Sequence, residues 1–209
     1  PPKEPMAAHI AAALRHAWGD RTMRGILAGL CLTSLFGASF MILLPVMVDA
    51  VLGHGAQGLG FITAATGVGS VAAALTLALR RESRGLGRIR VLAGVGFGVA
   101  LIAFGLSRNF WLSLAFASVL GFCLILFFAA ANTLLQLRSP DDLRGRIMAL
   151  YAVTLVGMAP FGSLFAGTLA SLVGAPATLV LAGAICALGV GALAATEPRA
   201  TAEAAPRAS

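Results

Sequence analysis

The chain has 209 residues, of which 59% are hydrophobic and only 11% are charged, and its formal net charge is +7. Soluble domains carry about 25% charged residues, so this composition excludes an ordinary soluble domain and indicates an integral membrane protein. The three cysteines lie far apart inside apolar runs, and their odd number excludes a complete disulfide framework.

Residues 1–23 precede the first long apolar run and predict a cytoplasmic connector. Within them, Ile10, Leu14 and Trp18 fall four residues apart and would form one stripe on a helix. The stripe fits a helix that lies on the membrane surface, and it fits a short connector helix equally well. Both interpretations stay open at this point.

Six later segments are long and apolar enough to cross a bilayer, which takes about 20 helical residues each. We expect them at residues 24–51, 57–79, 89–107, 110–137, 143–172 and 176–195. The polar, alanine- and proline-rich residues 196–209 predict a disordered cytoplasmic tail. The expected fold class is therefore an all-α membrane protein with a six-helix transmembrane bundle at 24–195.

Positive charge is distributed unevenly between the connections of this bundle. With six spans, both termini lie on the same side as the connections after spans 2 and 4, and 14 of the 15 lysine and arginine residues fall on that side. Only Arg108 falls on the other side. Because positively charged loops are retained in the cytoplasm, we expect both termini there.

Two prolines and repeated glycines interrupt the apolar spans. Pro45 and Pro160 each remove a helical hydrogen bond and should kink spans 1 and 5. Gly94 and Gly98 stand at GxxxG spacing, which lets helix backbones approach closely in lipid. Close packing explains these residues, and a bundle that flexes is the alternative explanation.

Few residues in the spans are suited to chemistry. An ionisable group inside a bilayer is a functional candidate, and Asp49, about one turn from the outer end of span 1, comes nearest to that description. The spans hold no serine–histidine or aspartate pair, and the chain has no HExxH or phosphate-binding motif. We therefore expect no enzyme, no ATPase, no cofactor and no metal site.

Uncharged polar side chains are the remaining candidates for lining a substrate cavity. The candidates are Ser34, Thr66, Ser70, Asn132, Gln136 and Thr154. Within this set, two pairs stand four residues apart, each pair on one helix face. Hydrogen bonding between helices is the first interpretation of these groups, and substrate contact is the second. Among the aromatic residues of span 4, Phe122, Phe127 and Phe128 are expected to meet lipid, and lining an apolar pocket is the alternative.

The segment SPDDLRGRIMAL, residues 139–150, gathers charges between spans 4 and 5. Ser139 suits the N-cap of a helix, and the proline and two aspartates that follow suit its first turn, where acids favour the positive end of the helix dipole. Arg144 and Arg146 would hold the connection in the cytoplasm. In a second role, Asp141 and these arginines would pair with a neighbouring loop and lock one conformation.

Two stretches resemble a known family. Residues 132–170, NTLLQLRSPDDLRGRIMALYAVTLVGMAPFGSLFAGTLA, are similar to the region around helices 10 and 11 of major facilitator superfamily transporters. They look most like the transmembrane secretion effectors, which include enterobactin-exporter-like and macrolide-efflux-like proteins. Residues 44–75 are similar to the helix 7–8 region of the same branch. The resemblance implies the C-terminal half of a major facilitator fold, with two inverted three-helix repeats.

By this resemblance the chain contacts the lipid bilayer, works with an N-terminal six-helix half and transports a small molecule. The implied activity is proton-linked export of small amphipathic compounds, siderophore- or drug-like, by alternating access across a bacterial-type inner membrane. An orphaned half that acts as a membrane interaction module and a half-transporter that dimerises are the alternatives.

The resemblance is incomplete in the loop after span 2. Arg84 stands where the superfamily usually has an aspartate, whereas Arg88 matches its signature. Together with Asp141, Arg144 and Arg146, these two arginines are the candidates for a cytoplasmic gate or latch. The unusual Arg84 puts the aspartate-centred form of that latch in doubt.

Overall fold

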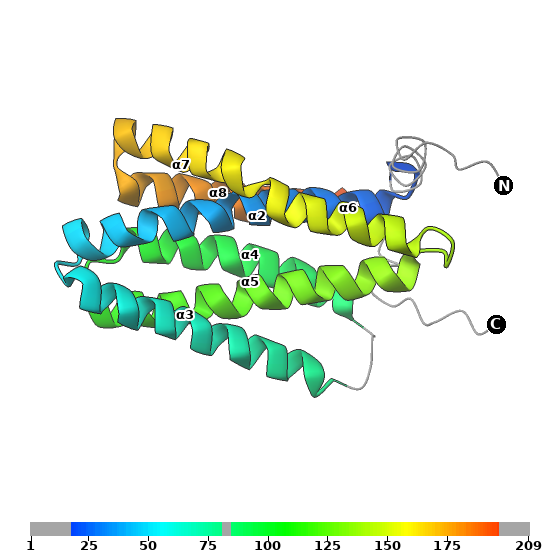
Figure 1. The fold of residues 1–209 in the computed structure, drawn as a ribbon, viewed down its shortest axis with the longest axis horizontal. Coiled ribbons are helices and arrows are strands. Elements are labelled where there is room, and N and C mark those ends of the chain that lie inside the picture. Colours follow the sequence, from blue (N-terminus) through cyan, green and yellow to red (C-terminus); the bar gives the residue numbers. More distant parts are fainter. Residues whose placement is uncertain (1–17, 81–84, 197–209) are drawn as a thin grey trace.

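The structure, a computed structural model, describes residues 18–80 and 85–196. In chain order its elements are α2 (Arg21–Val46), the π-helical turn η1 (Met47–Val51), α3 (Gly55–Ala78), α4 (Leu86–Leu106), α5 (Phe110–Arg138), α6 (Arg144–Gly157), α7 (Ala159–Val173) and α8 (Ala175–Thr196) (Figure 1). The described residues contain no strand, so the all-α fold class is confirmed. The expected tail, most of the connector and Arg84 fall outside the described ranges.

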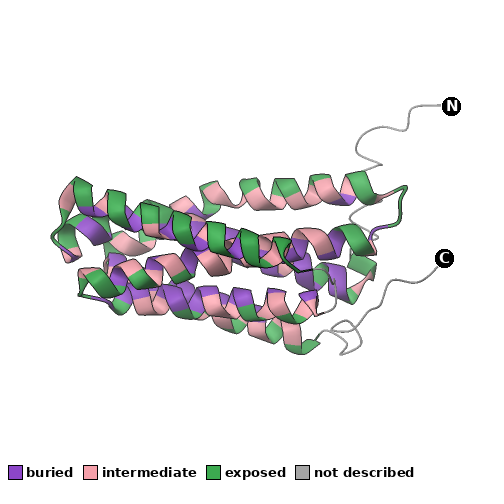
Figure 2. Cartoon of the chain, turned by 90° about the horizontal axis from the view of Figure 1, so that it is seen from below, coloured by how far each residue is buried: buried purple, intermediate pink, exposed green. Residues whose placement is uncertain are grey.

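Six helices are long and apolar enough to cross a membrane, and their ends differ from the expected spans by three residues at most. Span 1 is α2 with η1, and span 5 is α6 with α7. Exposed residues cover the outward faces of these helices, and buried residues fill the middle of the bundle (Figure 2). Trp18 and Trp111 are both exposed, at opposite ends of the bundle, where tryptophan favours the membrane–water interface.

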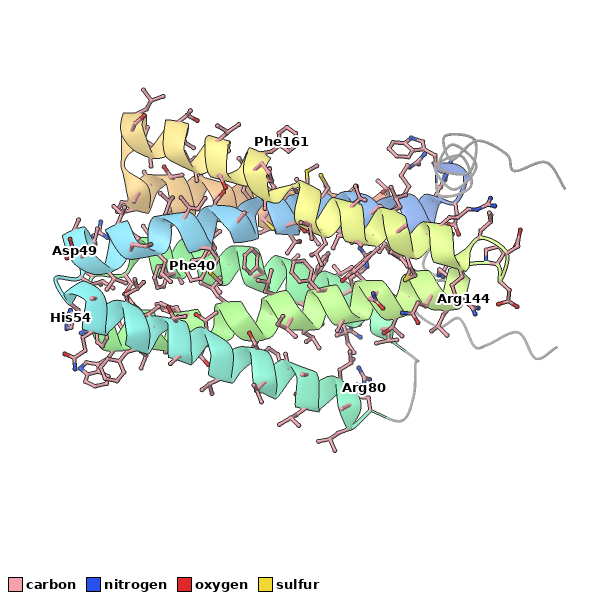
Figure 3. The ribbon with its side chains drawn as sticks, viewed as in Figure 1. Phe40, Asp49, His54, Arg80, Arg144 and Phe161 are labelled. Atoms are coloured by element: carbon pink, nitrogen blue, oxygen red, sulfur yellow. The ribbon has the colours of Figure 1, made fainter. Side chains whose placement is uncertain are left out.

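The two ends of the bundle differ in charge. One end holds the start of α2 and the connections after α3 and α5, and we call it the arginine-rich end. Its described arginines are Arg21, Arg24, Arg80, Arg88, Arg90, Arg138, Arg144 and Arg146. Figure 3 shows Arg80 and Arg144 at this end and Asp49 and His54 at the other. Among the described residues, only Arg108 brings a positive charge of this kind to the opposite end.

The helices form two layers. In the front layer, span 5 packs beside α2, α2 beside α5, and α5 beside α3. In the back layer, α4 packs against α5 and α8 packs against α2, while α4 and α8 contact each other closely. α6 crosses in front of parts of α2 and α5 (Figure 1). Elsewhere, no described helix of the chain covers the front face of this layer.

The first three spans (α2 to α4) and the last three (α5 to α8) form two three-helix units with the same pattern of contacts. α3 packs on α5 as α7 packs on α2, and α4 packs on α5 as α8 packs on α2. The contact between α4 and α8 lies between the two units. There, a Cβ atom at Gly98 would lie 2.6 Å from the Gly183 carbonyl oxygen, and one at Gly183 would lie 2.5 Å from the Gly98 carbonyl oxygen. This matching pattern of contacts in the two units agrees with two inverted repeats.

Glycine allows equally close contact between α3 and α5. A Cβ atom at Gly69 would lie 1.8 Å from the Ser118 carbonyl oxygen, and one at Gly121 would lie 2.0 Å from the Thr66 carbonyl oxygen. Ser70 Oγ lies 3.4 Å from the Gly121 carbonyl oxygen and donates a hydrogen bond to it. Since apolar burial does not drive helices together in lipid, such direct backbone contact and hydrogen bonding supply the attraction.

The prediction that Ser139 caps the helix of span 5 is wrong. Ser139 ends α5 instead, and its hydroxyl donates to the Leu135 carbonyl of that helix. The proline that follows favours an extended backbone at Ser139, and the N–H of Arg144 donates to the Pro140 carbonyl at 2.8 Å. Because this turn comes first, α6 begins only at Arg144 and both aspartates lie before it.

The prediction that the span 4 phenylalanines meet lipid is wrong for Phe127. Its side chain is fully buried, and it packs against Gly29 of α2 and Gly94 of α4. Phe122 and Phe128 are partly buried. The glycines create the space that draws Phe127 into the bundle, and their helices come from distant parts of the sequence.

Candidate functional site on the front layer

Spans 1 and 5 of the front layer are both interrupted at their prolines, as the sequence predicted. After Pro45, α2 passes into the π-helical turn η1. Span 5 breaks at Met158, between the end of α6 and the start of α7, and Pro160 stands in the first turn of α7. Proline fits that position because its missing N–H would have no helical partner there. Span 5 therefore consists of two helices with separate orientations.

α7 is fastened to α2 by close contacts. A Cβ atom at Gly162 would lie 2.2 Å from the Leu35 carbonyl oxygen, so the two backbones touch. The Ser39 hydroxyl donates to the Gly162 carbonyl at 3.2 Å. Phe165 of α7 packs edge-on against Phe36 of α2, with ring centroids 5.6 Å apart. These contacts fix α7 in the front layer.

α6 is held less firmly. Ile147 is its one fully buried residue. Whereas α7 packs on both α2 and α8, α6 packs on α2 and α5 and crosses the front of the bundle towards the end of α5 (Figure 1). Met148, Leu150, Tyr151 and Leu155 also contact the core but are only partly buried, so moving α6 costs less packing energy than moving a helix with a fully buried face. α6 is therefore the part of the front layer best suited to movement.

Polar groups of α5 and α6 meet where the two helices cross. Gln136 Nε2 donates to Asn132 Oδ1 on the same face of α5, and the Asn132 amide lies beside the Tyr151 hydroxyl of α6. That hydroxyl donates to the Phe128 carbonyl at 3.2 Å. Sequence reasoning missed Tyr151, although the one tyrosine of the chain, placed inside an apolar span, was an available signal.

Ser34 lies on the same face of the front layer, near the middle of α2. Gly37 packs against Leu124 of α5 and Ala38 packs against Gly162 of α7, so Ser34, one turn earlier, points between α5 and α7. Its side chain is 6% exposed, and its hydroxyl makes no hydrogen bond with any described residue. An unsatisfied buried hydroxyl costs about 1–3 kcal/mol, and a ligand could satisfy it if α6 moved away.

The other cavity candidates already have partners inside the bundle. Thr154 Oγ1 donates to the Leu150 carbonyl of its own helix at 2.8 Å, and Thr66 Oγ1 donates to the Ile62 carbonyl at 2.9 Å. Ser70 also donates a hydrogen bond to α5, which agrees with interhelical hydrogen bonding, the first interpretation of the pair Thr66 and Ser70. Substrate contact by these three hydroxyls stays a prediction.

At the arginine-rich end, two ion pairs join described residues of the front layer. Arg144 Nη2 lies 2.7 Å from Asp141 Oδ1, and Arg144 Nε donates to the Gln136 carbonyl at 3.4 Å. Arg144 therefore joins the start of α6 to the end of α5. Arg138 Nη1 lies 3.9 Å from Asp20 Oδ2, which joins the end of α5 to the start of α2. These contacts link α2, α5 and α6 at the arginine-rich end in this conformation.

Two arginines of α4 differ in environment. Arg88 is exposed, whereas Arg90 is only 1% exposed and its Nη1 donates to the Gly25 carbonyl of α2 at 3.4 Å. A Cβ atom at Gly29 would touch the same Nη1 atom at 3.4 Å. Gly25 and Gly29, four residues apart on α2, therefore make room for this arginine side chain. Arg146 of α6 is partly buried, and its part in a latch, like that of Arg88, stays a prediction.

The opposite end of the bundle carries Asp49 and His54 (Figure 3). Asp49 is exposed in η1 and is the one acid within the six described spans. The His54 ring stacks on Phe110 at the start of α5, with centroids 4.0 Å apart and planes at 9°. Within residues 18–80 and 85–196, no three histidine, cysteine or acidic side chains group as a metal site would require.

Comparison with known proteins agrees with this arrangement. The chain matches the family described as transmembrane secretion effector over residues 1–208. A comparison with curated proteins finds no match. The family match covers nearly the whole chain, and the six apolar spans with their repeated packing agree with a membrane transporter of this family. The chain therefore belongs to the transmembrane secretion effectors, a family of major facilitator transporters in the membrane.

Proposed function

We propose that the chain is the C-terminal half of a proton-linked exporter of small amphipathic molecules, siderophore- or drug-like. The observation that carries this proposal is the front layer, in which a firmly packed α7 continues into a weakly packed α6 that covers polar groups of α5. An exporter needs such a combination, because a rigid scaffold must hold a polar site that a movable element covers and uncovers.

The proposed substrate site lies between the uncovered face of this bundle and an N-terminal six-helix half. Ser34, Asn132, Gln136 and Thr154 are its proposed contacts from the sequence, and Tyr151 joins them by its position beside Asn132. Apolar side chains surround these groups, which suits an amphipathic substrate with few hydrogen-bonding groups. Thr66 and Ser70 are assigned a weaker role, since their hydroxyls already donate to carbonyl groups.

Alternating access would come from rocking of the two halves, with α6 as a gate at the cytoplasmic end. The ion pair of Asp141 with Arg144 and the hydrogen bonds of Arg144 and Tyr151 to α5 hold α6 in the present conformation. Opening the gate would break these contacts and expose Asn132. The arginine-rich end is placed in the cytoplasm of a bacterial inner membrane, because positive charge favours that side.

Proton coupling is assigned to the partner half. The described spans contain one acid, Asp49, and it lies exposed at the outer end, away from Ser34 and Asn132. A carboxylate that exchanges protons with substrate binding would have to lie near the midplane cavity.

Export from cells tests the proposal. Cells that carry the full reading frame are loaded with a panel of fluorescent amphipathic dyes, and dye accumulation is measured with and without a proton uncoupler. We expect lower accumulation than in cells without the gene, and loss of the difference with the uncoupler. Asn132→Ala should impair export, whereas Thr63→Ala, at an exposed position of α3, should not. Unchanged accumulation of every dye and every siderophore-like compound would favour the interaction module or the dimeric half-transporter instead.

A further inference from the structure

An open apolar groove of about 570 Å³ lies between α2 and α8, and the proposed transport site does not use it. Its lining residues are Ala28, Cys31 and Leu32 of α2 and Gly189, Ala192, Leu193 and Thr196 of α8. The only polar side chain among them, Thr196, stands at the end of α8, at the arginine-rich end of the bundle. The volume falls within the range of pockets that hold small organic ligands, about 300–1,000 Å³.

The break in span 5 explains why the groove is open. α7 packs on both α2 and α8, but beyond the break at Met158 span 5 turns towards α5, and α8 loses this neighbour. Cys31, in the groove, contacts Met158 through sulfur atoms 3.2 Å apart. The end of the groove that is farther from the arginine-rich end therefore lies at the break in span 5. At Gly189 a Cβ atom would lie 2.7 Å from Leu32 Cδ1, so the Leu32 side chain closes the floor there.

Two exposed arginines stand directly in line with the groove. Arg21 and Arg24 are seven and four residues before Ala28 on α2, so they lie on the helix face that lines the groove. Neither forms an ion pair with a described carboxylate. Along a helix, Ala28 lies about 6 Å and Leu32 about 12 Å from Arg24, because each residue rises about 1.5 Å. The groove thus leads from two positive charges into the apolar depth of the membrane.

The level of these arginines matches a lipid headgroup. Trp18, three residues before Arg21, is exposed, and exposed tryptophan favours the interface between headgroups and acyl chains. Arginine side chains near a helix end reach towards this interface and bind anionic phosphate groups. A ligand that fits both parts must carry a negative head and an apolar tail.

We propose that this groove binds an anionic phospholipid from the leaflet at the arginine-rich end. One acyl chain lies along Ala28, Leu32 and Ala192, and the phosphate contacts Arg24 and Arg21. The proposal does not depend on the transport proposal, because it concerns the lipid-facing side of α2 and α8. It assigns a role to the departure of α6 from α8, which leaves a lipid in place of a helix beside the break in span 5.

Native mass spectrometry of the purified 209-residue chain tests this site. The chain is titrated in detergent with dioleoyl phosphatidylglycerol or dioleoyl phosphatidylcholine, and the bound fraction is read from the spectrum. An arginine near an anionic lipid surface strengthens binding about fivefold, so the two arginines predict about 30-fold tighter binding of phosphatidylglycerol.

Four variants separate the headgroup from the groove. The double variant Arg21→Gln/Arg24→Gln should bind both lipids equally, whereas Arg108→Gln, at the opposite end, should keep the full preference. Ala192→Leu, at an exposed position of the groove, should weaken both lipids, and Ala74→Leu, at an exposed position of α3, should weaken neither. All five changed positions are exposed, so the substitutions should leave the buried packing of the bundle in place.

Several results would overturn the proposal. Equal binding of the two lipids by the unchanged chain would remove the role of the arginines. A preference that survives the double arginine change would place the phosphate elsewhere, and full binding in Ala192→Leu would place the acyl chain elsewhere. A dimer that excludes lipid and disappears in Ala192→Leu would assign the groove to a second copy of the chain.

Discussion

A single methyl group at Gly69 should separate α3 from α5. The added Cβ atom would lie 1.8 Å from the Ser118 carbonyl oxygen, whereas Cβ contacts under 3.0 Å are essentially never observed. The helices must therefore move apart by about 1 Å or more, which weakens the hydrogen bond from Ser70 to Gly121 as well. Overpacking of this kind costs about 1–3 kcal/mol.

Gly67 provides a matched control on the same helix. A Cβ atom there meets no atom within 4 Å, and alanine in place of glycine favours a helix by about 1 kcal/mol. Because both variants gain this preference, Gly69→Ala should be less stable than Gly67→Ala by the overpacking cost alone, about 1–3 kcal/mol. At about 2–4 °C per kcal/mol, the melting temperatures of the two purified variants should differ by at least about 2 °C. Equal melting temperatures would refute the α3–α5 contact described here.

Three further changes test other parts of the structure. Arg90→Ala removes a buried side chain and its bond to Gly25, so thermal unfolding should show a loss of about 2–5 kcal/mol, whereas Arg88→Ala at an exposed site should change stability by less than about 0.5 kcal/mol. Asn109→Ala removes the cap that accepts from the N–H groups of Trp111 and Leu112 and should cost about 1 kcal/mol in the same assay. Asp141→Asn breaks an exposed ion pair, so stability should fall by less than about 1 kcal/mol, while dye export should change if the pair holds the gate and stay normal if it does not.

The spans could be predicted from sequence because apolar length alone decides whether a helix crosses a bilayer. The break in span 5 and the turn after Pro45 were also predictable, since proline acts through the local backbone. The charge difference between the ends followed from counting arginines in the connections. Each of these features depends on residues that are close together in the sequence.

Features that depend on packing between distant helices could not be predicted. Arg88 and Arg90 stand two residues apart and so face opposite sides of α4, but which of them faces the bundle depends on α2, whose glycines leave space beside Arg90. Phe127 is buried for the same reason. The error at Ser139 has a local cause, since its hydroxyl is able to bond either to the preceding helix or to the following one, and the turn at Pro140 decides between them.

Labelling of a single cysteine at Ser34 tests alternating access most directly. Ser34→Cys is made in a full-length protein in which Cys31, Cys123 and Cys186 are alanine, and a membrane-impermeant maleimide is applied from each side of the membrane. If the two halves alternate, Ser34→Cys is labelled from both sides and substrate shifts the ratio, while Val99→Cys on the exposed face of α4 stays unlabelled. Labelling of Ser34→Cys from one side only, or none with or without substrate, would contradict alternating access.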